Sequence, residues 1–471
     1  RNRVYLAKLA VAETQMGLFE DKVIKNTCSS ELTLSKYEHA KTVGVIESDP
    51  IKKITKMAVP LGPIASLIPV TNPTSTVVTK SLFALKTRNA MCFMPHLKSP
   101  KCTSEAVRIC CEAAVAAGAP ENILQFFYPS KETSNLVMHH KTINLLVATG
   151  GPSMVQACYE SGKPAIGVGA GNAAVLIDET ANILDSVGSI VLSKTFDNGV
   201  ICASEQSVVI VDEVYDDAKA RFEHRGVYFV YGDDKDKLRN HMSVNGHINP
   251  DIVGQSALKI AHEAGILNVP PGTVVLAAEI EQVGIDEPLS GEKLSPILSF
   301  FRVQDFDKGC LKCQEIVNFG GKGHSSAIHT QTHERKFADM IPAFHLMVNM
   351  PTALGAIGTS YNFNVDPSMT LGVGSIGGSS MAGPLTPFHL LDVKTIAEKQ
   401  EHIEWFKNPP SVYFNRNCTE DALDDLCNTG VCHRAMIVTD RVMESLGHVK
   451  RIQSALSERG IISQVFSDVS P

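Results

Sequence analysis

The stretch INLLVATGGPSMVQACYESGKPAIGVGAGNAAVLID, residues 143–178, decides the fold class of this 471-residue chain. Its apolar start ends in the turn VATGG (147–151), residues 152–161 have helical periodicity, and AAVLID (173–178) is again short and apolar. A short apolar run, a helix and a second short run make up a βαβ unit. The same alternation recurs earlier in the chain, in IASLIPV (64–70), AMCFMP (90–95) and SEAVRICCEAAVAAGAP (104–120). We therefore predict an α/β fold with mostly parallel sheets.

Composition sets the broad class of the protein. A net charge of −7, carried by interspersed charges, indicates neither a nucleic-acid surface nor an acidic tail. No apolar stretch reaches the roughly 18 residues of a membrane span, and LGPIASLIPV (61–70) is interrupted by Pro63 and Pro69. The 12 cysteines lack framework spacing, which favours reduced thiols. We expect a soluble cytoplasmic protein, or an organellar one if a targeting peptide precedes a helical pattern that begins uncapped at residue 1.

Changes in sequence pattern and composition divide the chain into blocks. A second α/β block runs from about 203 to 325, so that Cys202 lies at the seam of the first two blocks. AEKQEHIEWFKNPP (397–410) is charged and closed by prolines, which is typical of a linker. Beyond it we predict strand, helix, strand, helix and a final apolar run, in SVYFN (411–415), CTEDALDDLCNTG (418–430), RAMIVTD (434–440), HVKRIQSALSERG (448–460) and ISQVFSDVSP (462–471). This is the opening of a further α/β segment.

Cys202 is a candidate nucleophile in TFDNGVICASEQSVVIVDE, residues 195–213. Asn198 and Gly199 are expected to stop the preceding helix and open a loop, and a thiol there can face a cleft between domains. Thiolate is favoured by backbone N–H groups and cations, whereas apolar burial opposes it. The alternative is a small packed side chain, which most of the cysteines must be, and the spacing alone favours that alternative.

Other stretches leave two interpretations open. VATGG lets backbone approach a cofactor but is not G-x-G-x-x-G, and GVGAGN (167–172) resembles that string without a strand-to-helix context. Asn72, in PVTNPTS (69–75), is either an oxyanion donor or a stabiliser of its own turn. His324, in GGKGHSS, is an acid or base or a structural loop residue. No metal site is predicted, because the C-x-x-C of Cys310 and Cys313 has no second pair and because His139 and His140 are adjacent rather than ligand-spaced.

Eight motifs in order resemble one family, namely TNPTS, KTRNA, VATGG, KPAIGVGAGN, SKTFDNGVICASEQSV, EKLSP, GHSS and TLGVGSIGG. From residue 1 to about 396 the chain resembles the CoA-acylating aldehyde dehydrogenase half of the bifunctional aldehyde-alcohol dehydrogenases. The remainder, with PPSVYF and RAMIVTD, resembles the start of their iron-dependent alcohol dehydrogenase domain. The resemblance implies an aldehyde dehydrogenase-like fold, with a Rossmann-type NAD-binding part at 1–202, a catalytic domain at 203–370, a return and oligomerisation segment at 371–396, a linker at 397–410 and a partial alcohol dehydrogenase segment at 411–471.

The resemblance also implies an activity and its residues. An NAD-dependent acetylating acetaldehyde dehydrogenase would interconvert acetaldehyde, CoA and NAD with acetyl-CoA and NADH, through a thioester on Cys202. Asn72 would stabilise the oxyanion with the backbone N–H of Cys202, and His324 would shuttle protons. The positions implied to contact NAD are Ser66, Leu67, Ile68, Pro69, Val70, Thr71, Gly151, Gly169, Glu292 at the nicotinamide ribose, Leu371 and, in the second domain, Asp440. The sequence stops before the family's iron ligands, so alcohol dehydrogenase activity is expected only in a longer protein.

One departure from hydrolytic aldehyde dehydrogenases predicts the acyl acceptor. Those enzymes carry a glutamate in an E-L-G-G loop thirty-four residues before the cysteine, and an ungapped overlay puts Val168 there. Without a general base, water attack on the thioester is slow and a thiol such as CoA takes the acyl group. Three alternatives stay open: a filament-forming module of the spirosome type with TLGVGSIGGSS at a subunit interface, a hydrolytic aldehyde dehydrogenase, and a cysteine hydrolase with a histidine-oriented nucleophile.

Overall fold

The computed structural model describes residues 1–244, 247–358, 361–362, 364–399, 411–428, 430 and 432–469. These residues form two compact units, Arg1–Glu398 and Lys399–Pro471, which are described separately. The change of unit falls inside the segment predicted as a linker. Most of that segment, residues 400–410, lies outside the described residues.

A five-stranded parallel sheet forms the first layer of the larger unit, with strand order β5-β4-β3-β6-β7. Its strands are β3 (Ile64–Ile68), β4 (Met91–Pro95), β5 (Leu124–Phe126), β6 (Leu145–Thr149) and β7 (Ala165–Val168). The crossover helices are α4 (Pro73–Lys86), α5 (Pro100–Ala116), α6 (Lys131–His139) and α7 (Pro152–Glu160). The chain starts at the central strand, winds outward to β5 and returns to β6. This is doubly wound topology, and its switch point lies between β3 and β6.

Continuous apolar runs form these strands because both faces of the sheet are covered. Along β3, Ile64 and Ile68 pack into one core cluster, while Ala65 and Leu67 pack into another. Helices on the two faces exclude water from both, so the sequence shows no polar alternation. The predicted α/β class and parallel sheet are confirmed.

Strand β7 is an element that the sequence reading missed. GVGAGN was interpreted as a connection from a helix directly to a strand, but β7 (Ala165–Val168) comes first and pairs with β6. The next strand, β8 (Ala173–Ile177), belongs to the other large sheet. The chain therefore changes sheets over residues 169–172, before the domain boundary predicted at residue 202.

The second large sheet is parallel and seven-stranded, with order β10-β13-β14-β9-β8-β15-β16. Besides β8 it contains β9 (Glu205–Val211), β10 (Val227–Phe229), β13 (Val275–Glu279), β14 (Ile297–Val303), β15 (Gly323–His329) and β16 (Ala343–Val348). One face carries α8 (Ile183–Thr195), α9 (Asp212–His224) and α14 (Thr352–Ala356). The other carries α10 (Gly232–Met242), α11 (Ala257–Glu263), α12 (Phe306–Gly320) and α13 (Glu334–Met340).

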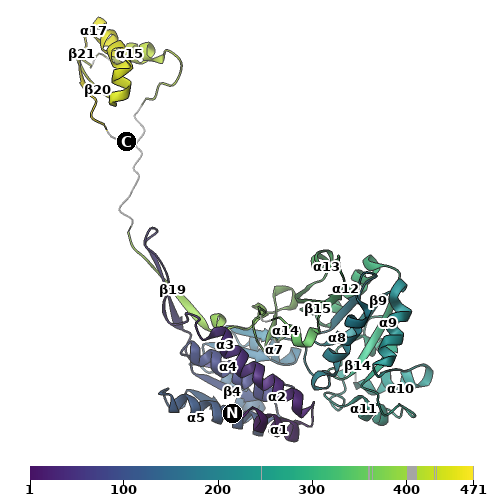
Figure 1. The fold of residues 1–471 in the computed structure, drawn as a ribbon. Coiled ribbons are helices and arrows are strands. Elements are labelled where there is room, and N and C mark those ends of the chain that lie inside the picture. Colours follow the sequence, from purple (N-terminus) through teal and green to yellow (C-terminus); the bar gives the residue numbers. More distant parts are fainter. Residues whose placement is uncertain are drawn as a thin grey trace. The chain divides into compact units, whose positions relative to one another are not determined.

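Smaller elements complete the unit. An antiparallel sheet joins β1 (Gly44–Asp49), β2 (Ile54–Pro60) and β19 (Leu391–Ala397), and β17 (Leu371–Val373) pairs with β18 (Ala382–Pro384). A short pair joins β11 (Ser243–Val244) and β12 (His247–Ile248). At the N-terminus come α1 (Arg3–Thr14), α2 (Phe19–Thr27), a π-helical turn at Cys28–Leu32 and α3 (Thr33–Tyr37). Helices α4 and α5 pack on β4, and α1 and α2 pack on these helices (Figure 1).

The smaller unit holds α15 (Cys418–Asn428), β20 (Arg434–Val438), α16 (Arg441–Ser445), α17 (His448–Glu458) and β21 (Ile462–Phe466), with β20 and β21 parallel. The strand predicted at 411–415 is wrong, because residues 411–414 have no regular structure. The other predicted elements of this segment are confirmed. Across the described part of the chain, no helix is both long and apolar enough to cross a membrane.

Candidate functional site

The switch point of the five-stranded sheet has the form at which open α/β sheets bind nucleotides. β3 ends at Ile68 and β6 at Thr149, and two helices begin a few residues later with a proline in their first turn, α4 at Pro73 and α7 at Pro152. Helix N-termini present free N–H groups and a positive dipole to an anion. Gly151 caps α7, and a Cβ there would meet nothing within 4 Å. These features fit a dinucleotide, so the residues predicted at 66–71 and 151 lie where an open α/β sheet binds one.

A buried cation lies beneath this edge, and the sequence reading missed it. Lys80 Nζ donates to Ser66 Oγ at 3.0 Å and to Thr149 Oγ1 at 3.1 Å, so it joins β3 to β6. Its side chain is fully buried, and burial lowers the pKa of the ammonium to about 7. A lone lysine within the apolar helical stretch TVVTKSLFAL was the available signal.

Cys202 lies in a tight turn ahead of β9. Asp197, Asn198 and Gly199 all have positive φ, of 50°, 53° and 71°, which ends the helical path after α8. The turn is then closed by Ser204, whose N–H donates to the Ile201 carbonyl at 2.9 Å. The predicted end of the helix before Cys202 is confirmed, and Cys202 taken as a whole residue is half-buried.

Groups around this thiol shift its pKa in opposite directions. Burial raises the pKa of Cys202 to about 12, and the carboxylate of Glu292 adds to the rise. The Lys25 ammonium and the backbone N–H groups of Cys202 and Ala203 lower the same pKa. The thiol is therefore protonated at neutral pH, and groups that favour its anion are already in place.

Gly171 links the loop after β7 to the cysteine turn and to His324. Its N–H donates to Glu292 Oε1 at 3.0 Å. A Cβ at this position would lie 2.3 Å from the Cys202 carbonyl oxygen and 3.0 Å from His324 Nδ1. Only glycine fits between these groups, so the structure brings Cys202, His324 and Glu292 into one neighbourhood.

His324 and Glu292 differ in their readiness to exchange a proton. Burial and the neighbouring His345 lower the pKa of His324 to about 3, which keeps the imidazole neutral. Its Nδ1 lies 3.0 Å from Ser325 Oγ, and its Nε2 has no hydrogen-bond partner among the described residues. Burial raises the pKa of Glu292 to about 7, against the opposing effects of the Gly171 N–H and two lysines. Glu292 is thus the better matched proton acceptor at neutral pH.

Asn72 is fixed by charged groups from elsewhere in the chain. It stands at the N-terminus of α4 and is 8% exposed, and its side chain makes no capping hydrogen bond to that helix. Oδ1 accepts a hydrogen bond from Lys25 Nζ, and Nδ2 donates to Thr71 Oγ1 at 3.1 Å. Lys25 is bound in turn by Asp197, in the loop before Cys202. The amide is therefore tied to the cysteine loop rather than to its own helix.

Comparison with known proteins assigns the family. The sequence pattern of the aldehyde dehydrogenase family matches residues 6–266 of this chain. The chain belongs to the aldehyde dehydrogenase family. An acetylating aldehyde dehydrogenase of Geobacillus thermoglucosidasius has a similar solved structure, with a TM-score of 0.83, 40% identity and coverage of 86% of this chain and 90% of that one. The aldehyde dehydrogenase-like fold predicted from the motifs is confirmed.

Two further relatives extend the comparison. The bifunctional aldehyde-alcohol dehydrogenase of Escherichia coli is 46% identical over 99% of this chain, which spans 53% of that protein. The chain thus covers about half the length of this relative, as the resemblance implied. A propionaldehyde dehydrogenase of Rhodopseudomonas palustris was solved with bound CoA and an acylated cysteine. It is 27% identical, with a TM-score of 0.73 and coverage of 84% of this chain and 87% of that one.

Within this aldehyde dehydrogenase, three further residues singled out from the sequence lie in different places. Val168 ends β7 and is 2% exposed, so no carboxylate stands there. Leu371 begins β17 beside Thr370, whose Oγ1 lies 3.1 Å from Thr149 Oγ1 at the switch point. Gly169 lines a hollow of about 460 Å³ formed by α7, the end of α12 and residues 373–378.

Asp440 belongs to the smaller unit, where it caps α16 by accepting the N–H of Met443 at 2.9 Å. Its predicted nucleotide contact stays a prediction.

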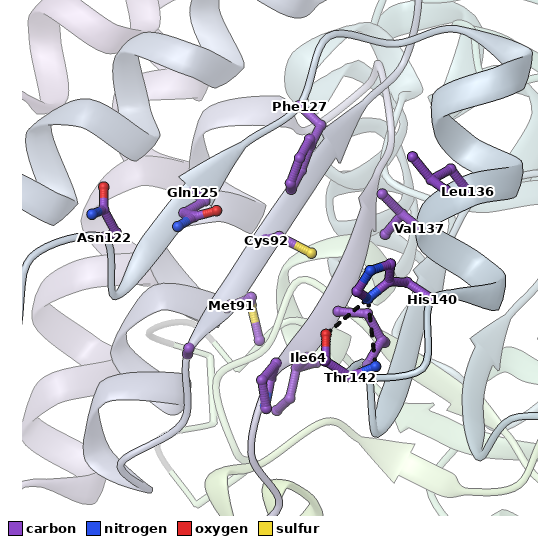
Figure 2. Close-up of a pocket in the computed structure, with 13 residues that line it drawn as sticks. Ile64, Met91, Cys92, Asn122, Gln125, Phe127, Leu136, Val137, His140 and Thr142 are labelled. Atoms are coloured by element: carbon purple, nitrogen blue, oxygen red, sulfur yellow. Dashed lines mark hydrogen bonds between the residues drawn. The ribbon is translucent and has the colours of Figure 1, made fainter.

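A cavity and a cluster of titratable side chains lie outside the Cys202 site. A cavity of about 380 Å³ opens at the amino ends of β3 and β4, beside Ile64 and Met91, with His140 bonded to Thr142 at its edge (Figure 2). Asp178, Glu179 and His333 gather at the carboxyl end of β8 and could hold a cation. Cys202 precedes β9, so it lies at the amino-terminal edge of the same sheet. Neither group therefore takes part in chemistry at Cys202.

Proposed function

We propose that this aldehyde dehydrogenase is CoA-acylating and interconverts acetaldehyde, CoA and NAD with acetyl-CoA and NADH. The observation that carries the proposal is the pairing of a cysteine turn, flanked by Asn72, Glu292 and His324, with a buried valine where a hydrolytic enzyme needs its base. The acetylating and bifunctional names of two relatives, and the bound CoA and acylated cysteine of a third, support the same reaction class.

In the first step the Cys202 thiol loses its proton to Glu292, and Sγ adds to the aldehyde carbonyl carbon. The oxygen becomes an alkoxide that accepts hydrogen bonds from Asn72 Nδ2 and the backbone N–H of Cys202. NAD would be held at the switch point by residues 66–71 and Gly151, and when bound it would supply the acceptor for the hydride that leaves that carbon. The carbon is thereby oxidised and a thioester remains on Sγ.

In the second step the thiol of CoA attacks the thioester, and Sγ leaves as the thiolate with the acyl group on CoA. Glu292 is the group suited to receive the thiol proton, and the neutral His324 lies beside the same turn. Val168 offers no base to water, and a thiol is more nucleophilic than water without one. The acyl group therefore leaves on CoA.

The test is NADH formation from acetaldehyde and NAD, with and without CoA. We expect continuous NADH formation with CoA and at most one equivalent per site without it. Steady turnover without CoA would refute the acylating proposal. Cys202→Ala should abolish NADH formation while NAD still binds, as measured by fluorescence titration.

We propose that residues 411–471 are the start of an iron-dependent alcohol dehydrogenase domain, with Asp440 near its nucleotide. We also propose that the protein is cytoplasmic. Self-association into dimers or filaments through 370–380 remains the alternative role for this chain. Light scattering on the purified protein separates discrete dimers from open polymers.

A further inference from the structure

Lys25 is a buried cation that joins three segments far apart in the sequence. It lies on α2 and is 1% exposed. Its Nζ donates to Asn72 Oδ1 at the start of α4 and to Asp197 Oδ2 in the loop before Cys202. The Thr71 carbonyl oxygen lies 3.4 Å from the same nitrogen. One ammonium group therefore reaches both segments that carry the proposed oxyanion donors.

The carboxylate of Asp197 anchors this cation. Asp197 is fully buried, and it also accepts the Leu18 N–H at 2.7 Å and Lys22 Nζ at 3.0 Å. Its own backbone N–H donates to Asp21 Oδ2 at 2.7 Å. Two lysines and two acids thus balance in charge, and the cluster ties α2 to the cysteine loop.

The hydrogen-bond chemistry of lysine fixes which way the Asn72 amide faces. An ammonium has three donors and no acceptor, so only Oδ1 of the amide can face it. Nδ2 must then point to the other side, where one N–H is taken by Thr71 Oγ1. The second N–H of Nδ2 remains for an oxyanion. The positive charge also polarises the amide, which strengthens Nδ2 as a donor.

Lys25 has a second effect on the same centre. Its charge favours the Cys202 thiolate against the effects of burial and of Glu292. The titratable and charged groups that face Lys25 are Lys22 and Asp21 on its own helix, Asp197 in the cysteine loop, and Cys202 itself. Among the described residues, Lys25 is thus the side-chain cation that both donates a hydrogen bond to Asn72 and lowers the pKa of Cys202.

We propose that Lys25 is a positioning residue for acyl transfer, which orients the Asn72 amide toward the oxyanion and favours the thiolate of Cys202. The proposal rests on the proposed function, in which Asn72 and Cys202 act on the aldehyde. It assigns a role in catalysis to helix α2, which contributes none of the residues implied by the motifs.

Lys22 supplies a matched control from the same helix. It is 2% exposed and donates to the same Asp197 oxygen and to the same Thr71 carbonyl. It does not bond the Asn72 side chain, and it does not figure among the charges acting on Cys202. Lys22→Met and Lys25→Met therefore remove the same group from the same carboxylate, and only the second releases the amide.

The experiment compares Lys25→Met, Lys25→Arg, Lys22→Met, Asn72→Ala and the Lys25→Met/Asn72→Ala double variant in the full chain. We expect Lys25→Met and Asn72→Ala each to lower kcat by about 100-fold, the usual size of a lost oxyanion donor, with little change in NAD affinity. The double variant should lose far less than the product of the two single losses, because both changes remove the same oxyanion contact and only the effect of Lys25 on the thiolate is independent of Asn72. Lys25→Arg keeps the charge and the donors in a larger side chain at a fully buried position, so its kcat should lie between those of Lys25→Met and the wild type.

Alkylation of Cys202 by iodoacetamide across pH gives a readout without turnover. Burial lowers the pKa of the Lys25 ammonium to about 8, so the side chain is charged at pH 7. Lys25→Met should therefore slow alkylation at pH 7 by about tenfold through loss of a nearby cation, and Lys22→Met should leave the profile close to wild type. Equal effects of the two lysine variants on kcat and alkylation, or multiplying effects of Lys25→Met and Asn72→Ala, would overturn the proposal. If Lys25→Met fails to fold, Lys25→Met/Asp197→Asn removes one cation and one acid, so the remaining Lys22 and Asp21 still balance in charge, and it is read against Asp197→Asn alone.

The outcomes separate this inference from the proposed function. A wild-type protein with no CoA-dependent NADH formation would overturn the proposed function. An active wild type in which Lys25→Met matches Lys22→Met would overturn the role of Lys25 alone.

Discussion

Replacing Gly171 by alanine is the sharpest test of the site geometry. The new Cβ would lie 2.3 Å from the Cys202 carbonyl oxygen and 3.0 Å from His324 Nδ1, whereas ordinary contacts begin near 3.4 Å. The cysteine turn or the loop must therefore move by about 1 Å, and a shift of that size at a reacting group costs about 100-fold in rate. The backbone of Gly171 does not have a positive φ, so strain at that residue does not add to the effect.

The assay is kcat/KM for acetaldehyde with saturating NAD and CoA, together with a urea unfolding curve. We expect a loss of about 100-fold in kcat/KM and a loss of about 1–3 kcal/mol in unfolding free energy from overpacking. Gly188→Ala on α8 is the control, because its Cβ meets only Arg225 at an ordinary 3.7 Å, and it should keep full activity. A Gly171→Ala protein that folds and retains activity within about threefold would show that the contact with Cys202 and His324 does not govern the chemistry.

Three further predictions follow from burial and charge. Glu292→Gln should speed alkylation of Cys202 near pH 9, because the carboxylate raises the thiol pKa, and slower alkylation would contradict that sign. Lys80 and Lys194 have pKa values of about 7 in the folded protein, against 10.5 in the unfolded chain. Above pH 7 the unfolded chain therefore binds more protons than the folded protein. The unfolding free energy, measured by urea titration, should then rise from pH 7 to pH 9. A curve that is flat in wild type, or no shallower after Lys194→Met, would refute this. Val168→Glu should produce slow NADH turnover without CoA where Val168→Gln does not, and equal behaviour of the two would refute the missing-base argument.

Much of the fold was predictable because both large sheets are parallel and buried. Strands of this kind appear as short, continuous apolar runs between helices, as in β3 and β9. β7 was missed because its four residues include a glycine and sit inside a string that resembles a nucleotide fingerprint. The strand at 411–415 was predicted from β-branched and aromatic residues, but Phe414 is 98% exposed and its backbone pairs with no described strand. Such propensity makes a strand only where a partner edge exists.

Some residues of the candidate site are recognisable from the local sequence, and others only from contacts between distant segments. Asn72, Cys202 and His324 stand in short motifs with turn residues around them, so the sequence could mark them. Lys25 and Asp197 could not be marked, because their bond joins residues 172 apart and Lys25 lies in an ordinary amphipathic helix. Buried polar contacts of this range depend on the packing of helices, which periodicity does not encode.

The charges around Cys202 also bear on why a thiol should be the acyl acceptor. Burial keeps the free cysteine protonated, Glu292 opposes its ionisation and Lys25 favours it, so the thiolate depends on where the proton of Glu292 resides. Glu292 is bound through Gly171 beside the thiol, whereas Val168 leaves the position of the hydrolytic base without a carboxylate. The site thus holds a proton acceptor suited to a sulfur nucleophile and lacks one at the position that activates water. A second thiol can use the same acceptor as the first, and this symmetry favours transfer between two sulfurs over hydrolysis.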